Sequence, residues 1–276
     1  MLDNFTELRF AKQMLKKKQR QFGSFQLPKE KLDAYSRDQN PAVMALCQTL
    51  ANLEKAEDCV VTSFGLGAIL TLCVAHLKRG DHILVSKNCF GSQERIFNKR
   101  AESFGFDVTF VDDDAAWNKE VRSTTRMAFL SSSEEEPTAC AHKIEERARM
   151  LHERADQNIH VVVDNTRQTN RNVKPLDHGA DFVLYTSTKG LEENPSVVAG
   201  AICGRKDEMK SVAQSMCEAK VCVSPFNAWA ILRGLGGESM AVLDRILGVG
   251  SKDDSGKVVS LQERSHAQAH GFPALV

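Results

Sequence analysis

Residues 180–190 of the chain read ADFVLYTSTKG, an apolar run that ends in small hydroxyl residues, a lysine and a glycine. An apolar run of this length, bounded by turn residues, is typical of a strand that is buried on both faces. Lys189 therefore follows the end of a predicted core strand. A charged side chain in this position either reaches solvent or has a partner that compensates for its burial.

The same kind of strand recurs along the chain and alternates with helical patterns. The spacing of apolar residues predicts helices at residues 41–57, 67–80, 92–105 and 143–155. Apolar runs predict strands at residues 58–61, 81–86, 107–111, 125–131, 159–164, 181–187 and 196–204. This alternation predicts an α/β fold with a mostly parallel sheet sandwiched by helices. Ligands bind beyond the carboxyl ends of the strands in such folds, so strand-end residues are the first functional candidates.

Composition excludes several classes of partner. The chain has 276 residues, 42% of them hydrophobic, which is enough for one large domain or one and a half. Lys+Arg and Asp+Glu balance at 36 each, so no global charge recruits nucleic acid or an acidic membrane. No apolar run has the length of a membrane span, and the N-terminal residues lack the apolar centre of a signal peptide. We expect a cytoplasmic protein without nucleic-acid or membrane partners.

The 8 cysteines give no sign of a metal site or a disulfide framework. None of them forms a CxxC pair, and no Cys/His cluster has the spacing of zinc ligands. Most lie within apolar stretches such as LTLCVAHL. We predict buried, reduced thiols and no bound metal.

Three strand ends carry candidate functional residues. The turn TSFGLGA, residues 62–68, has small residues that let backbone N–H groups surround an anion, although glycines in such turns also serve packing. Asp164 closes an apolar strand and either caps the next segment or faces a cation. Lys189 is either a surface lysine or a Schiff-base lysine. Pyridoxal phosphate needs a lysine, an acid for its ring nitrogen and phosphate donors, and Lys189, Asp164 and the turn with Thr186 and Thr188 would supply all three.

Several motifs, in order, resemble a known family. They read YSRDQNP, TSFGLGAI, GDHILVSKNCFGS, VVVDNT, GADFVLYTSTK and SPFNAWAILRGL, between about Tyr35 and Met240. Together they resemble the Cys/Met-metabolism group of pyridoxal-phosphate enzymes, which includes cystathionine synthases and lyases and homoserine-ester sulfhydrylases. The stretches VSKNCFGSQERIF, DDAAW and SPFNAWAILRGL are most similar to the O-succinylhomoserine sulfhydrylase branch.

The resemblance implies a role for each residue that matches a family motif. Lys189 matches the lysine that forms the Schiff base with pyridoxal 5'-phosphate, and Asp164 matches the acid that keeps the ring nitrogen protonated. Thr186 and Thr188 match hydroxyl positions near the phosphate. Phe90 matches the aromatic residue that stacks on the ring.

Further matches concern the phosphate and the neighbouring subunit. Gly65 and Leu66 match the turn whose backbone amides bind the phosphate. Tyr35 and Arg37 match a pair that reaches the phosphate of a neighbouring subunit, so the resemblance implies a homo-oligomer, at least a dimer, with shared active sites. It also implies the large domain of fold-type I enzymes at residues 35–247, after an atypical arm at 1–34 and before a polar tail at 248–276. The C-terminal small domain is expected to be largely absent.

The implied reaction is a γ-replacement on an activated homoserine, a small amino-acid substrate, giving homocysteine or cystathionine. A cystathionine or methionine γ-lyase is an alternative within the family. An unrelated dinucleotide-binding protein is disfavoured because no GxGxxG turn opens the first helix.

Departures from the family pattern leave a further alternative open. Glu136 stands where relatives have an asparagine that touches the cofactor, and Arg167 stands where they usually have an apolar residue. The stretch GLEENPS, residues 190–196, replaces an aromatic and glycine-rich run, and no motif matches the C-terminal arginine that grips the substrate carboxylate. A catalytically impaired relative, which binds the cofactor or an intact paralogue, is the second hypothesis.

Overall fold

The computed structural model describes residues 40–89, 91–99, 101–112, 117–132, 136–154, 158–186, 197–235, 251–252 and 258–259. The chain divides into two units, residues 36–243 and a second unit formed by residues 1–35 and 244–276. In the second unit β8 (Ser251–Lys252) pairs antiparallel with β9 (Val258–Val259). The predicted domain boundaries at 34/35 and 247/248 lie outside the described residues.

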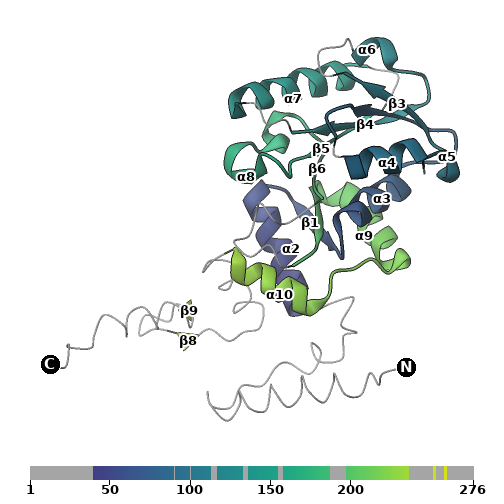
Figure 1. The fold of residues 1–276 in the computed structure, drawn as a ribbon. Coiled ribbons are helices and arrows are strands. Elements are labelled where there is room, and N and C mark those ends of the chain that lie inside the picture. Colours follow the sequence, from purple (N-terminus) through teal and green to yellow (C-terminus); the bar gives the residue numbers. More distant parts are fainter. Residues whose placement is uncertain are drawn as a thin grey trace. The chain divides into compact units, whose positions relative to one another are not determined.

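The larger unit is built on a seven-stranded sheet with the order β1-β7-β6-β5-β4-β2-β3 (Figure 1). The strands are β1 (Asp58–Thr62), β2 (His82–Ser86), β3 (Asp107–Val111), β4 (Thr125–Ser131), β5 (His160–Asp164), β6 (Phe182–Tyr185) and β7 (Gly200–Gly204). Strands β2 to β6 pair in parallel, and β7 runs antiparallel to both β1 and β6. Strands β1 to β6 therefore share one direction, and their carboxyl ends lie along one edge. The predicted mostly parallel α/β sheet is confirmed.

Helices cover both faces of this sheet (Figure 1). They are α2 (Pro41–Glu54), α3 (Gly65–His76), α4 (Gly91–Lys99), α5 (Ala101–Phe104), α6 (Trp117–Glu120), α7 (Pro137–His152), α8 (Thr169–Asn172), α9 (Lys206–Ala219) and α10 (Pro225–Gly234), with a 3-10 turn, η2 (Pro175–His178). Successive residues of a strand point to opposite faces of the sheet and pack into the two hydrophobic clusters that cover those faces. Val162 packs with α3 and α9, whereas Val161 and Val163 pack with α6 and α7. By the same alternation, His160 and Asp164 project toward the face that carries α3.

Local signals fix the ends of the helices. The Asn40 side chain accepts a hydrogen bond from the amide of Ala42 (3.0 Å), and Pro41 occupies the first turn of α2. Gly105 has a φ of 83°, a left-handed conformation that glycine adopts readily, and it ends α5. The segment predicted as one helix at 92–105 contains α4 and α5, and Arg100 between them lies outside the described residues.

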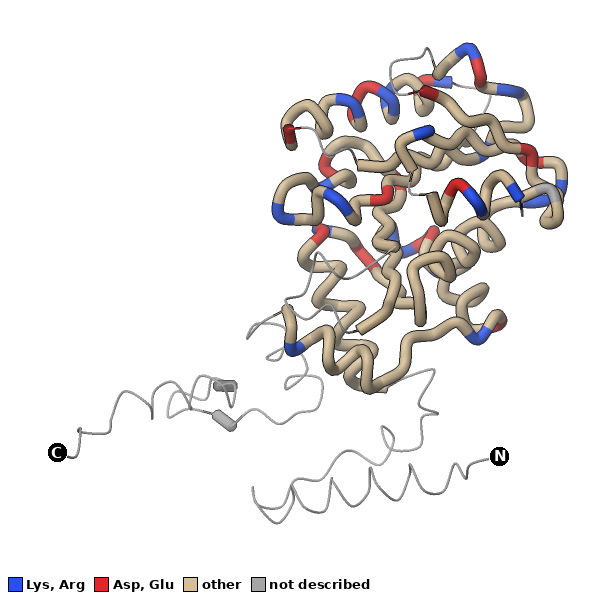
Figure 2. Tube along the Cα trace, in the orientation of Figure 1, with Lys and Arg blue, Asp and Glu red and all other residues tan. Residues whose placement is uncertain are grey.

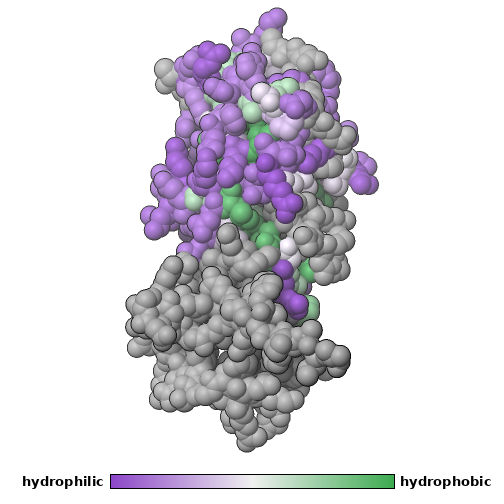
Figure 3. Space-filling view, turned by 90° about the vertical axis from the view of Figure 1, so that its left-hand side faces the viewer, coloured by the Kyte–Doolittle hydropathy of each residue, from purple (hydrophilic) through white to green (hydrophobic). Residues whose placement is uncertain are grey.

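Basic and acidic residues are both spread along the described chain, in keeping with the net charge of zero (Figure 2). The side of the molecule shown in Figure 3 is mostly hydrophilic, with a narrow strip of hydrophobic side chains where residues are described. Among the described residues, no helix combines the length and the apolar character that crossing a membrane requires.

Candidate functional site

The structure brings together three of the strand ends that carry candidate residues. Asp164 ends β5 and pairs in register with Leu184 of β6, two residues before Thr186. The turn after β1 leads into α3 at Gly65, and this glycine lies against the backbone of Thr186. Gly65, Asp164 and Thr186 therefore meet at the carboxyl edge of the sheet, where open α/β sheets bind ligands.

Asp164 is a buried carboxylate whose described hydrogen-bond donors are all neutral. Its Oδ1 accepts hydrogen bonds from the amide of Thr166 (2.9 Å) and the Thr166 hydroxyl (2.5 Å). Its Oδ2 accepts from the Thr186 hydroxyl (3.0 Å) and from Nε2 of Gln93. Burial raises the pKa of Asp164, and the hydrogen bonds from Thr166, Gln93 and Thr186 oppose that rise.

Asp164 has no cationic partner within the described part of the chain. A fully buried carboxylate is unfavourable unless a positive charge compensates for its lost hydration. The side chain is only 1% exposed, so water does not supply that compensation. The site is therefore matched to a ligand that carries a positive charge toward Asp164.

Gln93, like Thr166, belongs to this site and was not among the residues predicted from the sequence. It is fully buried on α4, and its Nε2 also donates to the Thr186 hydroxyl (3.1 Å). Gln93 and Phe97 are the buried residues of that helix, one turn apart. A polar residue on the apolar face of an amphipathic helix was the available signal.

The start of α3 offers unused backbone donors. The N-cap residue, Phe64, gives no side-chain cap. Among the described residues, the N–H groups of Gly65 and Leu66 have no hydrogen-bond partner. Such orphan donors, at the positive end of a 12-residue helix, suit an anionic group such as a phosphate.

Behind the strand ends lies a second buried cluster. The Tyr185 hydroxyl donates to Oε1 of Glu54, and Nδ2 of Asn165 donates to the Tyr185 hydroxyl oxygen (3.3 Å) and to the Val173 carbonyl (2.8 Å). Glu54 comes from α2, so the cluster ties that helix to the ends of β5 and β6. Burial raises the pKa of Glu54 to about 7, and the Tyr185 hydrogen bond and the charge of Lys174 limit that rise.

The pKa of Glu54 predicts a pH-dependent stability. Between its ordinary pKa of 4.5 and about 7, the folded chain keeps the proton while the unfolded chain has lost it. The free energy of unfolding should therefore fall by about 3 kcal/mol as pH rises through this window. In Glu54→Gln this part of the pH dependence should vanish. Urea denaturation of both proteins at pH 5 and pH 8 measures the difference, and equal pH dependence in the two would contradict the assignment.

Comparison with known proteins identifies the family. A family model described as Cys/Met metabolism PLP-dependent enzyme matches residues 12–241. The chain belongs to this family. The Cys/Met metabolism family consists of enzymes that depend on pyridoxal phosphate and act on small amino acids of the transsulfuration routes. The predicted family and its cofactor are thus confirmed.

Curated relatives in the Cys/Met metabolism family carry several activities. O-succinylhomoserine sulfhydrylase of Pseudomonas aeruginosa is 35% identical over 205 residues, which cover 74% of this chain and 50% of that protein. A probable cystathionine gamma-synthase of Herpetosiphon aurantiacus is 34% identical, over 73% of this chain and 62% of that protein. An L-methionine gamma-lyase of Treponema denticola is 32% identical, over 73% of this chain and 51% of that protein. The chain spans about half the length of the curated relatives it matches.

Solved structures of this enzyme family share the fold. The crystal structure of metB from Corynebacterium glutamicum matches with a TM-score of 0.67 and 27% identity, over 80% of this chain and 58% of that one. A cystathionine gamma synthase from Xanthomonas oryzae pv. oryzae, in complex with aminoacrylate and cysteine, matches with a TM-score of 0.64 and 28% identity. The match covers 76% of this chain and 53% of that one. The predicted fold-type I architecture of the large domain is confirmed.

The residues at the strand ends fit the family's cofactor. Asp164 has no cationic partner among the described residues, and a protonated pyridine nitrogen would provide a positive charge. The free amides of Gly65 and Leu66 suit its phosphate. The predicted site residues Tyr35, Arg37, Phe90, Thr188 and Lys189 lie outside the described residues, so their roles stay predictions.

Three other residues singled out from the sequence form hydrogen bonds within the chain. The Thr186 hydroxyl donates to Asp164, and its predicted place near the phosphate stays a prediction. Glu136 is exposed and caps α7, its Oε2 accepting from the amide of Thr138 (3.2 Å). Arg167 donates from Nη1 to the carbonyl of Asn88 (3.3 Å).

Proposed function

We propose that this chain binds pyridoxal 5'-phosphate at the carboxyl edge of its sheet and takes part in γ-replacement on an activated homoserine. The buried carboxylate of Asp164, which has no cationic partner among the residues that the structure describes, carries the proposal. The similarity to an O-succinylhomoserine sulfhydrylase and to a probable cystathionine gamma-synthase supports the reaction class. Sulfide as the nucleophile would give homocysteine, and cysteine would give cystathionine.

Each residue of the site has a defined task in this proposal. When bound, pyridoxal phosphate supplies an electron sink that stabilises negative charge at the substrate α-carbon. Asp164 holds its ring nitrogen in the protonated form, and Thr166 and Thr186 fix the orientation of that carboxylate. The amides of Gly65 and Leu66 hold the phosphate.

The residues outside the described part complete the proposal on the strength of the family resemblance. Lys189 is the attachment point and holds the proton removed from the substrate, and Phe90 lies against the ring. Thr188 adds a hydroxyl near the phosphate. Tyr35 and Arg37 serve a neighbouring copy, which makes the working form a homo-oligomer of at least two chains. A cytoplasmic location remains part of the proposal.

A second candidate is a catalytically impaired family member that associates with an intact paralogue. Gln93 favours it, because its amide already occupies Oδ2 of Asp164. With two donors on each oxygen, the four acceptor sites of the carboxylate are filled within the chain. A bound cofactor has to displace or share the position that Gln93 holds.

The spectrum of the full chain with added pyridoxal phosphate tests the first proposal. We expect a visible chromophore that borohydride fixes to the protein and that is absent in Lys189→Ala. Assays of sulfide and cysteine replacement on homoserine esters, and of elimination from cystathionine and methionine, then separate synthase from lyase. Absence of any chromophore would refute cofactor binding, and a chromophore without turnover would support the impaired relative.

Gln93 gives a separate prediction about cofactor affinity. Gln93→Ala frees Oδ2 of Asp164 in the empty protein, so the cofactor no longer competes with an existing hydrogen bond. A hydrogen bond to a charged group contributes about 1.5–3 kcal/mol, so we expect pyridoxal phosphate to bind roughly tenfold more tightly. Equilibrium dialysis measures this. Gln214→Ala, which removes an exposed glutamine bonded to Glu218, is the matched control. Equal affinities of Gln93→Ala and wild type would show that Gln93 does not compete.

A further inference from the structure

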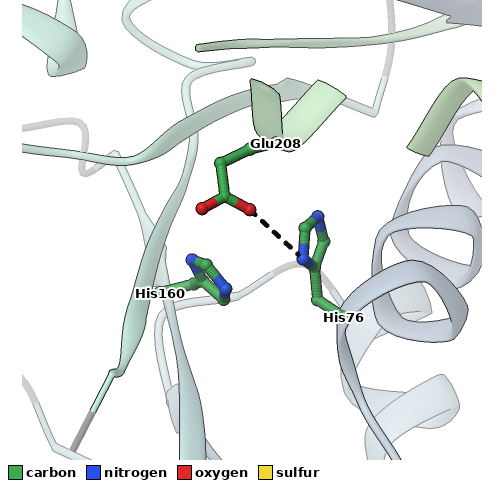
Figure 4. A group of neighbouring side chains, drawn as sticks. All are labelled: His76, His160 and Glu208. Carbon is green, nitrogen blue, oxygen red and sulfur yellow. Dashed lines mark ion pairs between the residues drawn. The ribbon is translucent and has the colours of Figure 1, made fainter. Parts of the chain in front are cut away.

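A group of metal-ligand side chains gathers at the amino end of β5, opposite the edge that carries Asp164. His76 is the last residue of α3, His160 is the first residue of β5, and Glu208 lies in the first turn of α9. Their ligand atoms all lie within 4.8 Å of one another. Figure 4 shows the three side chains pointing into one shared space from three separate elements. We propose that they bind a divalent transition-metal ion, with zinc as the best-matched ion.

His160 is the residue that points to a ligand. Its side chain is 9% exposed, and neither ring nitrogen has a hydrogen-bond partner in the part of the chain that the structure describes. Its ring packs against His76 (centroids 4.7 Å apart) and Phe182 (5.5 Å). Its ring nitrogens keep some exposure to solvent and have no described protein partner, so they are open to a metal ion in the shared space.

His76 faces the same space with a nitrogen that is not in hydrogen-bond range of Glu208. Nδ1 of His76 and Oε2 of Glu208 are 3.7 Å apart. Two ligands bound tetrahedrally to zinc at about 2.0–2.1 Å are separated by roughly 3.4 Å, so this separation suits a bridging ion. On the other side of the ring, Nε2 lies 3.5 Å from the Ser211 hydroxyl. Zinc-bound histidines use their second nitrogen in this way.

The charges around the group are compatible with a cation. Oε1 of Glu208 pairs with Nη2 of Arg205 at 3.3 Å, which leaves Oε2 directed to the histidines. Nitrogen donors with one carboxylate select zinc, cobalt or nickel over magnesium and calcium. The bound ion would clamp the end of α3 and the start of α9 to β5.

The experiment is a metal titration of the full chain, purified with a chelator and then freed of it. We expect one equivalent of zinc to bind in competition with a chromophoric chelator. His160→Ala and Glu208→Gln should each lower the affinity by roughly tenfold or more, since each removes one of three protein ligands. His152→Ala is the matched control, because His152 pairs with Asp181 (2.9 Å) outside the group. Its affinity should equal that of the wild type.

Cobalt as a probe excludes the cysteines as the binding site. Cobalt bound by His and Glu shows weak visible bands, whereas thiolate ligands add strong near-ultraviolet charge-transfer bands. Weak bands that disappear in Glu208→Gln, a variant that leaves the core unchanged, would support the site. Thiolate bands, no binding, or unchanged affinity in His160→Ala and Glu208→Gln would each overturn it.

Discussion

Asp164→Asn should weaken the binding of pyridoxal phosphate by roughly 100-fold. The change removes the negative charge that, in the proposed function, would compensate a protonated ring nitrogen inside a fully buried site. Breaking a buried ion pair by removing one partner costs about 3–5 kcal/mol, and loss of the proton from the ring nitrogen recovers part of that. Turnover should fall further than affinity, because a ring without that proton accepts electrons less well.

The same variant should leave the empty protein nearly as stable as the wild type. An asparagine oxygen still accepts from Thr166, and the amide can donate to Thr186 or to a rotated Gln93 side chain. Urea denaturation of the empty protein, alongside equilibrium dialysis, therefore separates lost binding from unfolding. Asp181→Asn, which alters a carboxylate bonded to the amide of Val161 (2.7 Å) at the opposite edge, is the control. Unchanged cofactor affinity in Asp164→Asn would remove the basis of the proposed function.

Gly65→Ala should destabilise the fold by about 3 kcal/mol or more. A Cβ atom at this position would overlap the backbone carbonyl of Thr186. The backbone of Gly65 is also packed closely against Gly200, since a Cβ atom on Gly200 would lie 2.7 Å from Gly65 Cα. Three backbone segments thus meet where a methyl group has no room, and backbone relaxes less readily than the end of a side chain. Accommodating the methyl group means separating α3 from the end of β6.

Chemical denaturation of Gly65→Ala measures this loss, and Gly91→Ala is the control. Gly91 begins α4, and a Cβ there would meet no atom within 4 Å. Alanine in that helical position should be neutral or stabilising by roughly 0.5 kcal/mol. If Gly65→Ala were as stable as Gly91→Ala, the close packing of α3 on β6 would be wrong.

The parts of this molecule that the sequence predicts are those encoded locally. Continuous apolar runs mark the buried strands, and the polar residue that follows each run marks its carboxyl end, which is how Asp164 and Thr186 become candidates. The direction of β7, by contrast, is not encoded locally. Its residues suit any buried strand, and its antiparallel position between β1 and β6 depends on pairings between distant segments.

The residues that the sequence leaves hidden depend on contacts between elements. Gln93 becomes significant only when α4 packs beside β5, and Glu54 only when α2 meets Tyr185. The histidines of the proposed metal site show no ligand spacing, because His76, His160 and Glu208 come from segments far apart in the chain. Rules based on ligand spacing detect metal ligands that lie within one element or loop. In this group each of the three ligands lies on a different element, so no such spacing exists.

The position of β1 also affects how the nascent chain folds on the ribosome. Thr62 of β1 and its partner Gly200 are 138 residues apart, and the bridge from Thr62 to Cys222 involves an even later segment. Strands β2 to β6 can pair as they emerge, whereas β1 waits with its apolar residues uncovered until β7 is synthesised. An uncovered apolar strand of this kind is a target for chaperones and for misassembly. The turn at Gly65, the proposed phosphate site, is consequently among the last parts to dock, so a cofactor would meet a completed site only after synthesis has passed β7.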